Sequence, residues 1–485
     1  TAGQQNSQGD GNTFVGKAAG FWNTTLGDNT YIGMNSGSVL GQKNVSSGVR
    51  SLAGTFAAVS ESVAIGYEAG TNSQAGQVTF VGSEAGRANT AVGSISVGYQ
   101  SGYTQTSGAR NTNIGYQAGY SVSTSSSNTH IGYQAGRYHN TPGNVLIGEY
   151  AGSSAAWALV GGTVVGQNAG LRLQYGDGIT AIGRYAAQGV TGTQGARQGC
   201  TFVGEYSGSY ANSNFNTVVG SFALYGVDNV SNPNQTVAVG YEALYATTTG
   251  DQNTVVGYRA GKNITSSPDN VFIGHSAGIN FNNTGGDGRN VAVGSGAGND
   301  LTTGIYNTFL GYQAGALNTN ITTGNFNVMV GYQAVGSGTT ASNQNSFGYS
   351  AACTANNQIT LGNTSIGAIR AQVTSITAIS DERDKTSIET IPYGLEFVNS
   401  LQPKKFVWDH RAETDSEGNE FFSSNKGKKD IGFIAQELQS VDDDYLNLVY
   451  DENPDKLEAT YGRLIPVLVQ AIKELKAEVE LLKNK

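Results

Sequence analysis

A serine and a lysine whose types suit proton transfer stand five residues apart, at Ser380 and Lys385. A serine hydroxyl is a poor nucleophile until a base removes its proton, and a lysine acts as that base only where its surroundings lower its pKa towards neutrality. The same segment also suits a helix N-cap, because Ser380 is followed by the acidic residues Asp381 and Glu382. On these residues alone the helix cap is favoured. The choice between a catalytic pair and a helix cap therefore depends on the sequence around them.

The serine opens a part of the chain whose composition differs from everything before it. Residues 380–485 contain 22 Asp and Glu and 14 Lys and Arg, whereas residues 1–379 contain only 14 and 13. Of the 69 glycines, 64 precede residue 380. A chain of 485 residues has room for several domains, and this change predicts a domain boundary near residue 379.

Ordered sequence blocks and an apolar repeat follow the charged opening. The blocks are Tyr393-Gly394-Leu395-Glu396-Phe397-Val398, Leu401-Gln402-Pro403-Lys404-Lys405-Phe406-Val407-Trp408 and Ile431-Gly432-Phe433-Ile434-Ala435-Gln436-Glu437-Leu438. The apolar residues of the C-terminus recur at steps of three and four, at Leu464, Leu468, Ile472, Leu475, Val479 and Leu482. This spacing predicts a coiled coil over residues 463–485, with charged residues such as Glu474 on its outer faces.

This ordered set resembles the intramolecular chaperone domain at the C-termini of endosialidases and other phage tail fibres and spikes. The resemblance covers residues 380–485 and implies a small α+β domain that trimerises, guides folding of the preceding β-structure and releases itself by autoproteolysis. It places the nucleophile at Ser380, the general base at Lys385 and the scissile bond at Ile379–Ser380, so the implied activity is a serine endopeptidase that cuts only its own chain. The other residues of the chaperone motif are Asp381, Arg383, Gly432, Ala435, Gln436 and Glu437.

Residues 1–362 are an internal repeat, seen most clearly in the frame Asn111-Thr112-Asn113-Ile114-Gly115-Tyr116-Gln117-Ala118-Gly119. The first glycine of the frame recurs from Gly16 to Gly362, mostly every 16 or 17 residues. The double step from Gly33 to Gly66 implies one degenerate copy between them. A unit this short is too small for a helical repeat and suits one coil of short strands and turns.

Alternation within the frame predicts strands, with Thr112, Ile114, Tyr116 and Ala118 on one face. The residue before the anchor glycine is almost always aliphatic, and we expect that column to be the interior of a parallel β-solenoid of about 20 coils. The recurrent alanine suits a narrow core, and the recurrent Gly-Tyr predicts a stacked tyrosine column that supports the coil or a subunit contact.

Phrases such as Glu61-Ser62-Val63-Ala64-Ile65-Gly66-Tyr67-Glu68-Ala69 resemble the coil repeat of trimeric autotransporter adhesin heads. The resemblance covers most of residues 12–362 and implies a homotrimeric β-roll, although the coil here is longer. The expected organisation is therefore a β-solenoid over residues 1–362, a connector over 363–379 and the chaperone domain over 380–485.

Composition excludes several other classes of function. The net charge of −9 argues against nucleic acid or anionic lipid as a main partner. With a mean hydropathy of −0.27 and no apolar run of membrane length, we expect no membrane insertion. The chain begins at Thr1 without an initiator methionine or signal peptide, so we expect it to be part of a longer protein.

Cysteines, histidines and acidic residues give no further catalytic pattern. Cys200 and Cys353 lie far apart in the sequence and are expected to be buried, apolar residues. The histidines and aspartates of the repeat are scattered, so no metal and no cofactor are predicted. A polysaccharide depolymerase needs two carboxylates at a defined separation, and the repeat glutamates follow the anchor glycines instead. The better candidates for receptor binding are aromatic residues of turns and insertions, at Trp22, Trp157, Tyr210 and Phe215.

The preferred interpretation is the distal part of a homotrimeric phage tail fibre that binds a host-surface polysaccharide or protein. The expected location is the virion tail, after synthesis in the host cytoplasm, with other tail proteins at the N-terminal end. A chaperone is needed because a slip by one coil buries nearly the same residues, so register must be set before the repeats pair. The alternatives are a tailspike glycan depolymerase and a bacterial trimeric adhesin.

Overall fold

The structure is a computed structural model of the whole chain, described here over most of its length. The described residues are 1–54, 58–74, 76–153, 159–173, 175–189, 196–226, 231–316, 321–370, 372, 380–409, 411, 413–414, 420–421, 426–455 and 457–485. Internal contacts divide the chain into two compact units, Thr1–Gln313 and Ala314–Lys485.

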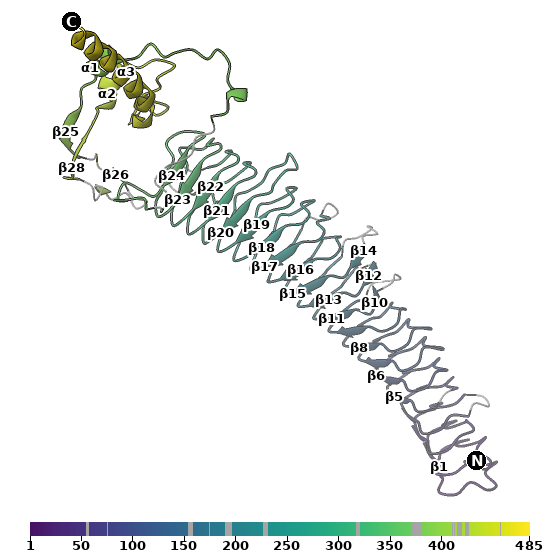
Figure 1. Cartoon of the computed structure of the whole chain (residues 1–485). Coiled ribbons are helices and arrows are strands. Elements are labelled where there is room, and N and C mark those ends of the chain that lie inside the picture. Colours follow the sequence, from purple (N-terminus) through teal and green to yellow (C-terminus); the bar gives the residue numbers. More distant parts are fainter. Residues whose placement is uncertain are drawn as a thin grey trace. The chain divides into compact units, whose positions relative to one another are not determined.

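The first unit is built from three-residue strands that pair in parallel, each with the next coil (Figure 1). They are β1 (Thr13–Val15), β2 (Thr30–Ile32), β3 (Val45–Ser47), β4 (Val63–Ile65), β5 (Thr79–Val81), β6 (Ile95–Val97), β7 (Thr112–Ile114), β8 (Thr129–Ile131), β9 (Val145–Ile147), β11 (Thr163–Val165), β13 (Thr180–Ile182), β15 (Thr201–Val203), β16 (Thr217–Val219), β17 (Val237–Val239), β18 (Thr254–Val256), β19 (Val271–Ile273), β20 (Val291–Val293) and β21 (Thr308–Leu310). A shorter parallel ladder is formed by β10 (Leu159–Val160), β12 (Tyr175–Asp177) and β14 (Ala196–Gln198).

The second unit begins with a parallel ladder of the same kind, made by β22 (Val328–Val330), β23 (Asn345–Phe347) and β24 (Ile359–Leu361). The fold of the repeats is thus a parallel β-solenoid of about 19 turns, as the repeat predicts. The degenerate copy expected between Gly33 and Gly66 is β3, which is followed by Gly48.

The anchor glycines are required by the close approach of successive coils. Gly115 has φ +133°, and a Cβ built on it would lie 2.3 Å from the carbonyl oxygen of Gly132 in the next coil. Gly132 stands in the same relation to Gly148, at 2.6 Å. A side chain at this position would therefore meet both an unfavourable backbone conformation and a backbone atom that has no room to move.

The expected interior column is wrong, because the aliphatic residue before the anchor glycine faces outwards. Ile114 is 37% exposed and Leu310 is 47% exposed. The buried residue is instead the middle one of the strand in nearly all coils, and its type varies along the solenoid, as at Phe80, Asn113 and Leu146. Since side chains alternate along a strand, burying the middle residue turns the first and third residues outwards.

The predicted alternation of side chains between two faces also stops where the strand ends. Tyr116 is exposed like Ile114, but Ala118 is completely buried. The period of two stops because Gln117 has φ 50°, in the left-handed region, so the chain turns there. The recurrent alanines do line a narrow core, as predicted, and both Cys200 and Cys353 are buried free thiols.

The tyrosines after the anchor glycines form stacked columns, as expected. Rings of Tyr99 and Tyr116 lie 5.3 Å apart, and rings of Tyr116 and Tyr133 lie 5.1 Å apart at an angle of 8°. Tyr241 and Tyr258 stack in the same way at 5.5 Å. Tyr116 therefore has its two ring faces against tyrosines of the coils before and after it.

A ladder of buried asparagine side chains explains the Asn at the start of the frame. The backbone N–H of Asn270 donates to Oδ1 of Asn253 at 3.0 Å, and that of Asn290 donates to Oδ1 of Asn270 at 3.1 Å. Asn307 continues the series by donating to Asn290 at 3.0 Å. Each side chain thus satisfies a backbone donor of the next coil that would otherwise be buried without a partner.

The buried histidine pair makes the solenoid sensitive to acid. His130, the middle residue of β8, is 0% exposed, and its Nδ1–H donates a 2.7 Å hydrogen bond to Asn113 Oδ1. His139 lies beside it with ring centres 5.9 Å apart. Burial, reinforced by the charge of His139, lowers the pKa of His130 to about 3, and burial lowers the pKa of His139 to about 4. An unfolded chain takes up both protons below its pKa of 6.5, whereas the folded chain does not until pH falls through these values.

We therefore expect stability to be complete above pH 6.5 and to fall on acidification by about 1.4 kcal/mol per pH unit for each histidine. His130→Asn should remove one of the two contributions, because Asn113 already occupies the paired position in the preceding coil. Denaturant midpoints at neutral pH and near pH 5 measure this. His275→Asn, at an exposed site, is the matched control and should leave the slope unchanged. An equal slope in His130→Asn and the unaltered chain would contradict the assignment.

The rest of the second unit is a small α+β region (Figure 1). Its elements are η1 (Glu382–Asp384), α1 (Leu395–Ser400), β25 (Lys404–Val407), β26 (Glu413–Thr414), β27 (Glu420–Phe421), β28 (Lys429–Gly432), α2 (Ala435–Gln439), β29 (Val449–Tyr450), β30 (Glu458–Ala459), η2 (Tyr461–Arg463) and α3 (Leu464–Lys483). Antiparallel pairs join β25 to β28, β26 to β27 and β29 to β30. None of the helices in the described ranges combines the length and the apolarity that a membrane crossing requires.

An apolar cluster packs helices α1, α2 and α3 of this region together. Its buried members are Leu438 of α2, Leu446 and Leu448 of the following loop, and Leu464 and Val467 of α3. The first residue of the predicted coiled-coil stripe, Leu464, therefore packs against its own domain. The later stripe residues are exposed, as at Leu468 and Ile472.

Candidate functional site

The η1 turn brings the serine and the lysine of the charged segment together. Lys385 follows the last residue of η1, and its Nζ lies 2.5 Å from Ser380 Oγ and donates to the Ser380 carbonyl oxygen at 3.2 Å. Residues five apart reach each other because the tight turn doubles the chain back. The two predicted catalytic residues are thus in direct contact, as their proposed roles require. Ile379, the other side of the predicted scissile bond, lies outside the described residues.

Asp381 rather than Ser380 caps the turn. Asp381 Oδ1 accepts hydrogen bonds from the backbone N–H of Arg383 at 2.9 Å and from its Nε at 3.0 Å, and Oδ2 accepts from the guanidinium at 2.6 Å. The bonds to Arg383 hold the pKa of Asp381 below its usual value. The helix-cap interpretation therefore applies to the next residue, which leaves the Ser380 hydroxyl available to the lysine.

The arrangement can transfer a proton, but it is open to water in the single chain. Ser380 and Lys385 are both exposed, and the Arg383 side chain is 89% exposed. A lysine becomes a base near neutral pH when burial or neighbouring cations disfavour its charged form. In this state the Ser380 hydroxyl and the Lys385 amine are in contact, and both are open to water.

The glycine of the third sequence block is required by an aromatic contact. A Cβ on Gly432 would lie 2.5 Å from Tyr461 Oη, which accepts a hydrogen bond from the backbone N–H of Phe433 at 3.1 Å. The Phe433 and Tyr461 rings also meet edge to face at 5.7 Å. Gly432 thus lets the end of β28 close on η2.

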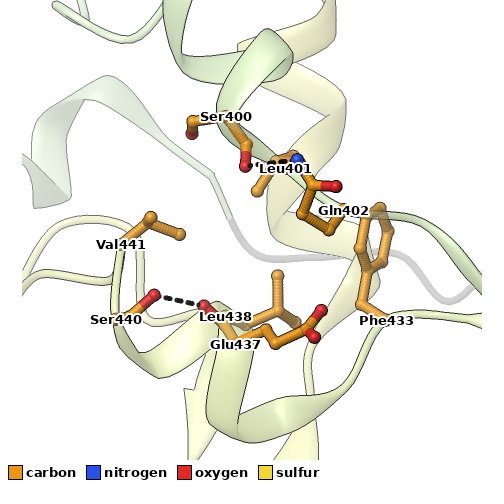
Figure 2. Close-up of a pocket in the computed structure, with 8 residues that line it drawn as sticks. All are labelled: Ser400, Leu401, Gln402, Phe433, Glu437, Leu438, Ser440 and Val441. Carbon is orange, nitrogen blue, oxygen red and sulfur yellow. Dashed lines mark hydrogen bonds between the residues drawn. The ribbon is translucent and has the colours of Figure 1, made fainter.

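The remainder of this block forms α2 and one wall of a pocket of about 260 Å³ (Figure 2). Ala435 begins α2, Gln436 is exposed, and Glu437 points to the pocket beside Phe433. Glu437 also pairs with Lys404 Nζ at 3.5 Å. The predicted motif residues therefore fall into two groups. The charged opening forms the Ser–Lys contact, and the 432–437 block joins β28 to α2 and lines one side of this pocket.

Two acidic side chains that sequence reasoning did not identify fix the helices of this domain. Glu474 Oε2 of α3 accepts the backbone N–H of Leu395 at 2.6 Å, and this bond lowers the pKa of Glu474. Glu474 was expected on an outer face and instead caps α1. Asp443 binds the Tyr393 hydroxyl, and that bond lowers the pKa of Asp443 and raises the pKa of Tyr393 to about 12. The only sequence signal is Gly394, where a Cβ would overlap the Glu474 carboxylate.

The aromatic residues proposed for receptor binding occupy separate coils. Trp22 lies between β1 and β2, half-buried, with its ring edge-on to Phe21 at 4.8 Å. Tyr210 and Phe215 lie between β15 and β16, and Phe215 is 59% exposed. Trp157 lies outside the described residues. The structure thus places the fully described candidates at two positions along the solenoid.

The glutamates of the repeat are engaged with neighbouring coils. Glu68 is buried between Arg50 at 2.7 Å and Arg87 at 3.2 Å. Glu242 pairs with Arg259 at 2.8 Å and Lys262 at 2.6 Å. These carboxylates link successive coils, which gives them a structural role of the kind the repeat pattern indicates.

Comparison with known proteins concerns the C-terminal part of the chain. No curated protein matches the sequence. One family model matches the chain, and because the matched segment ends at residue 447, α3 lies outside it. Over residues 380–447, which include Ser380, Lys385 and the 432–437 block, the chain matches the family described as the chaperone of endosialidase, which confirms the resemblance of this part to an endosialidase-type chaperone.

Proposed function

We propose that this chain is the distal part of a phage tail fibre, in which three copies of the solenoid bind the host surface. Its C-terminal domain acts as an intramolecular chaperone. The observation that carries the proposal is the order of parts: a β-solenoid is followed by a sequence of the endosialidase chaperone family. That order joins a long repetitive β-structure to a domain that guides assembly.

Register is the physical problem that such a domain solves. Successive strands carry the same columns, so a chain displaced by one coil still pairs Thr with Thr or Val and aliphatic with aliphatic residues, as β7 and β8 show. A domain that joins three chains at one end fixes which coil faces which before the solenoids associate. The chaperone is therefore expected to act first and the repeats to pair afterwards.

Release follows from the Ser–Lys contact. Lys385 removes the proton from Ser380 Oγ as the oxygen attacks the carbonyl carbon of residue 379. The Oγ–C bond forms while the C–N bond between residues 379 and 380 breaks, and the proton passes to the departing amino group of Ser380. Water then hydrolyses the ester, which restores the Ser380 hydroxyl and frees residues 1–379. Assembly that excludes water from Lys385 would make cleavage depend on correct folding.

A binding experiment tests the attachment function. The assembled protein, fluorescently labelled, should bind saturably to some members of a panel of bacterial strains that differ in surface polysaccharide. Cells of a binding strain that have been stripped of the polysaccharide or treated with protease serve as controls and identify the receptor class. Release of new reducing ends from the polysaccharide would instead support a depolymerase. Absence of binding to any strain of a broad panel would contradict the proposal.

A further inference from the structure

The outer surface of the main ladder in Thr1–Gln313 is an apolar face of unusual length. The third residue of each strand contributes one column, as at Ile32, Ile65 and Ile114, which are 37–43% exposed. In seven coils a tyrosine follows the anchor glycine and forms an interrupted second column beside the first, and other coils have polar or charged residues there, such as Glu149 and Arg184. Neighbours above and below cover the flanks of each side chain, so the exposed parts are the outward tips.

The area of this face exceeds what a single folded chain usually leaves in water. Its seven exposed tyrosines are Tyr67, Tyr99, Tyr116, Tyr133, Tyr241, Tyr258 and Tyr312, at 40–52% exposure. At about 200 Å² each, they alone present roughly 600 Å². The aliphatic column adds enough to exceed the ~800 Å² that each partner contributes to a stable interface, and the largest apolar patch of a monomer is about 300–600 Å².

We infer that this face, the aliphatic column together with the tyrosine column, is the surface on which copies of this chain pack against one another. The inference rests on the proposed assembly and adds to it the face and the residues involved. The aliphatic column is present in nearly every coil, and only a partner with the same coil spacing can match it over this length. A second copy in parallel orientation has that spacing by construction.

An independent element indicates that copies meet in parallel. On α3, Leu468, Ile472, Leu475 and Val479 are 39–65% exposed, while the face carrying Val467 and Ala471 is buried in its own domain. Exposed apolar residues at steps of three and four are typical of a helix that pairs with other helices in a coiled coil. Identical helices that associate in parallel at one end orient the solenoids in the same direction.

The geometry of the tyrosines favours a protein partner over a sugar. Sugars stack on the exposed face of an aromatic ring, but Tyr116 has its two faces on Tyr99 and Tyr133. Two charged residues of the tyrosine column, Arg184 and Glu205, also pair with each other. The face therefore offers ring edges and aliphatic tips, which suit close packing against a like surface.

Site-specific cross-linking of the full chain tests the inference. Ile114→Cys places a thiol on the face, and Thr124→Cys places one at an exposed loop position of the same coil as the matched control. The native thiols, Cys200 and Cys353, are buried. After treatment with a short bis-maleimide, Ile114→Cys should give covalently joined chains with a yield roughly tenfold or more above Thr124→Cys, because proximity sets the rate. Light scattering of each sample before treatment gives the number of copies.

The outcomes separate the inference from the proposed assembly. A trimeric mass with cross-links confined to Ile114→Cys supports both. A trimeric mass with cross-links at Thr124→Cys, or at neither position, overturns the inference and leaves the assembly standing. A monomeric mass overturns both.

Discussion

Ser380→Ala should leave the chain at its full 485 residues, whereas the unaltered chain should separate into residues 1–379 and 380–485. The alanine removes the hydroxyl that lies 2.5 Å from Lys385 Nζ, and with it the nucleophile. Lys385→Ala removes the base and should slow cleavage by about 10²–10⁴-fold. Intact mass under denaturing conditions measures both effects directly.

Two further variants test whether cleavage needs Lys385 as a base or only its positive charge. Lys385→Arg keeps a cation that can donate to Ser380 but cannot accept its proton near neutral pH, so this variant should also remain whole. Glu382→Gln, an exposed neighbour within η1, should be cleaved like the unaltered chain. Cleavage of Ser380→Ala at the same bond would exclude Ser380 as the nucleophile. Full-length mass in every sample, the unaltered chain included, would mean that the domain stays attached as a permanent cap.

Charges on the exposed face of α3 should abolish assembly. Leu468 and Ile472 are 44% and 65% exposed in the single chain, so Leu468→Asp combined with Ile472→Asp leaves the domain's own core intact. In an assembled coiled coil the same residues are buried, and losing both apolar contacts costs about 3 kcal/mol or more, roughly a hundredfold in dissociation constant. Light scattering should show loss of the trimer and a larger insoluble fraction.

The control is Lys476→Asp on the same helix, where the native side chain is 76% exposed and its change should have little effect on assembly. Because assembly is proposed to exclude water from Lys385, the doubly substituted chain should also be cleaved more slowly. An unassembled chain that cuts itself at the full rate would remove that link while leaving the Ser–Lys chemistry in place.

Much of the architecture was predictable because it depends on spacing. The recurrence of the anchor glycines predicts the coil length, the parallel ladder and the degenerate copy at β3. The Ser380–Lys385 contact was inferred from family resemblance, and the local turn explains how five residues suffice. Such features are local, so a short stretch of sequence contains the information that specifies them.

The inner and outer faces could not be assigned from the repeat. A period of two separates the faces of a strand, but choosing the inner one assumed that the uniformly aliphatic column avoids water. The true interior admits Phe80, Asn113 and His130 at the same position, because buried polar side chains bond to those of neighbouring coils, as His130 bonds to Asn113. Its column therefore has no uniform residue type. The inferred contact with another chain would account for a uniform outer column, and reasoning on one chain alone does not include such a contact.

The role of Glu474 was missed for a related reason. Its position on the helix indicated an outer face, yet its partner is the backbone of Leu395, far away in the sequence. Periodicity along one helix gives no information on which distant segment packs against it.

The most direct test of the account compares refolding with and without the C-terminal domain. Full-length Ser380→Ala, which retains the chaperone, and a chain of residues 1–379 are unfolded in denaturant and diluted under identical conditions. The recovered trimer is measured by light scattering and the recovered β-structure by circular dichroism. We expect Ser380→Ala to recover the assembled solenoid and residues 1–379 to remain unassembled or to aggregate. Equal recovery of correctly assembled trimer from both chains would contradict the chaperone function.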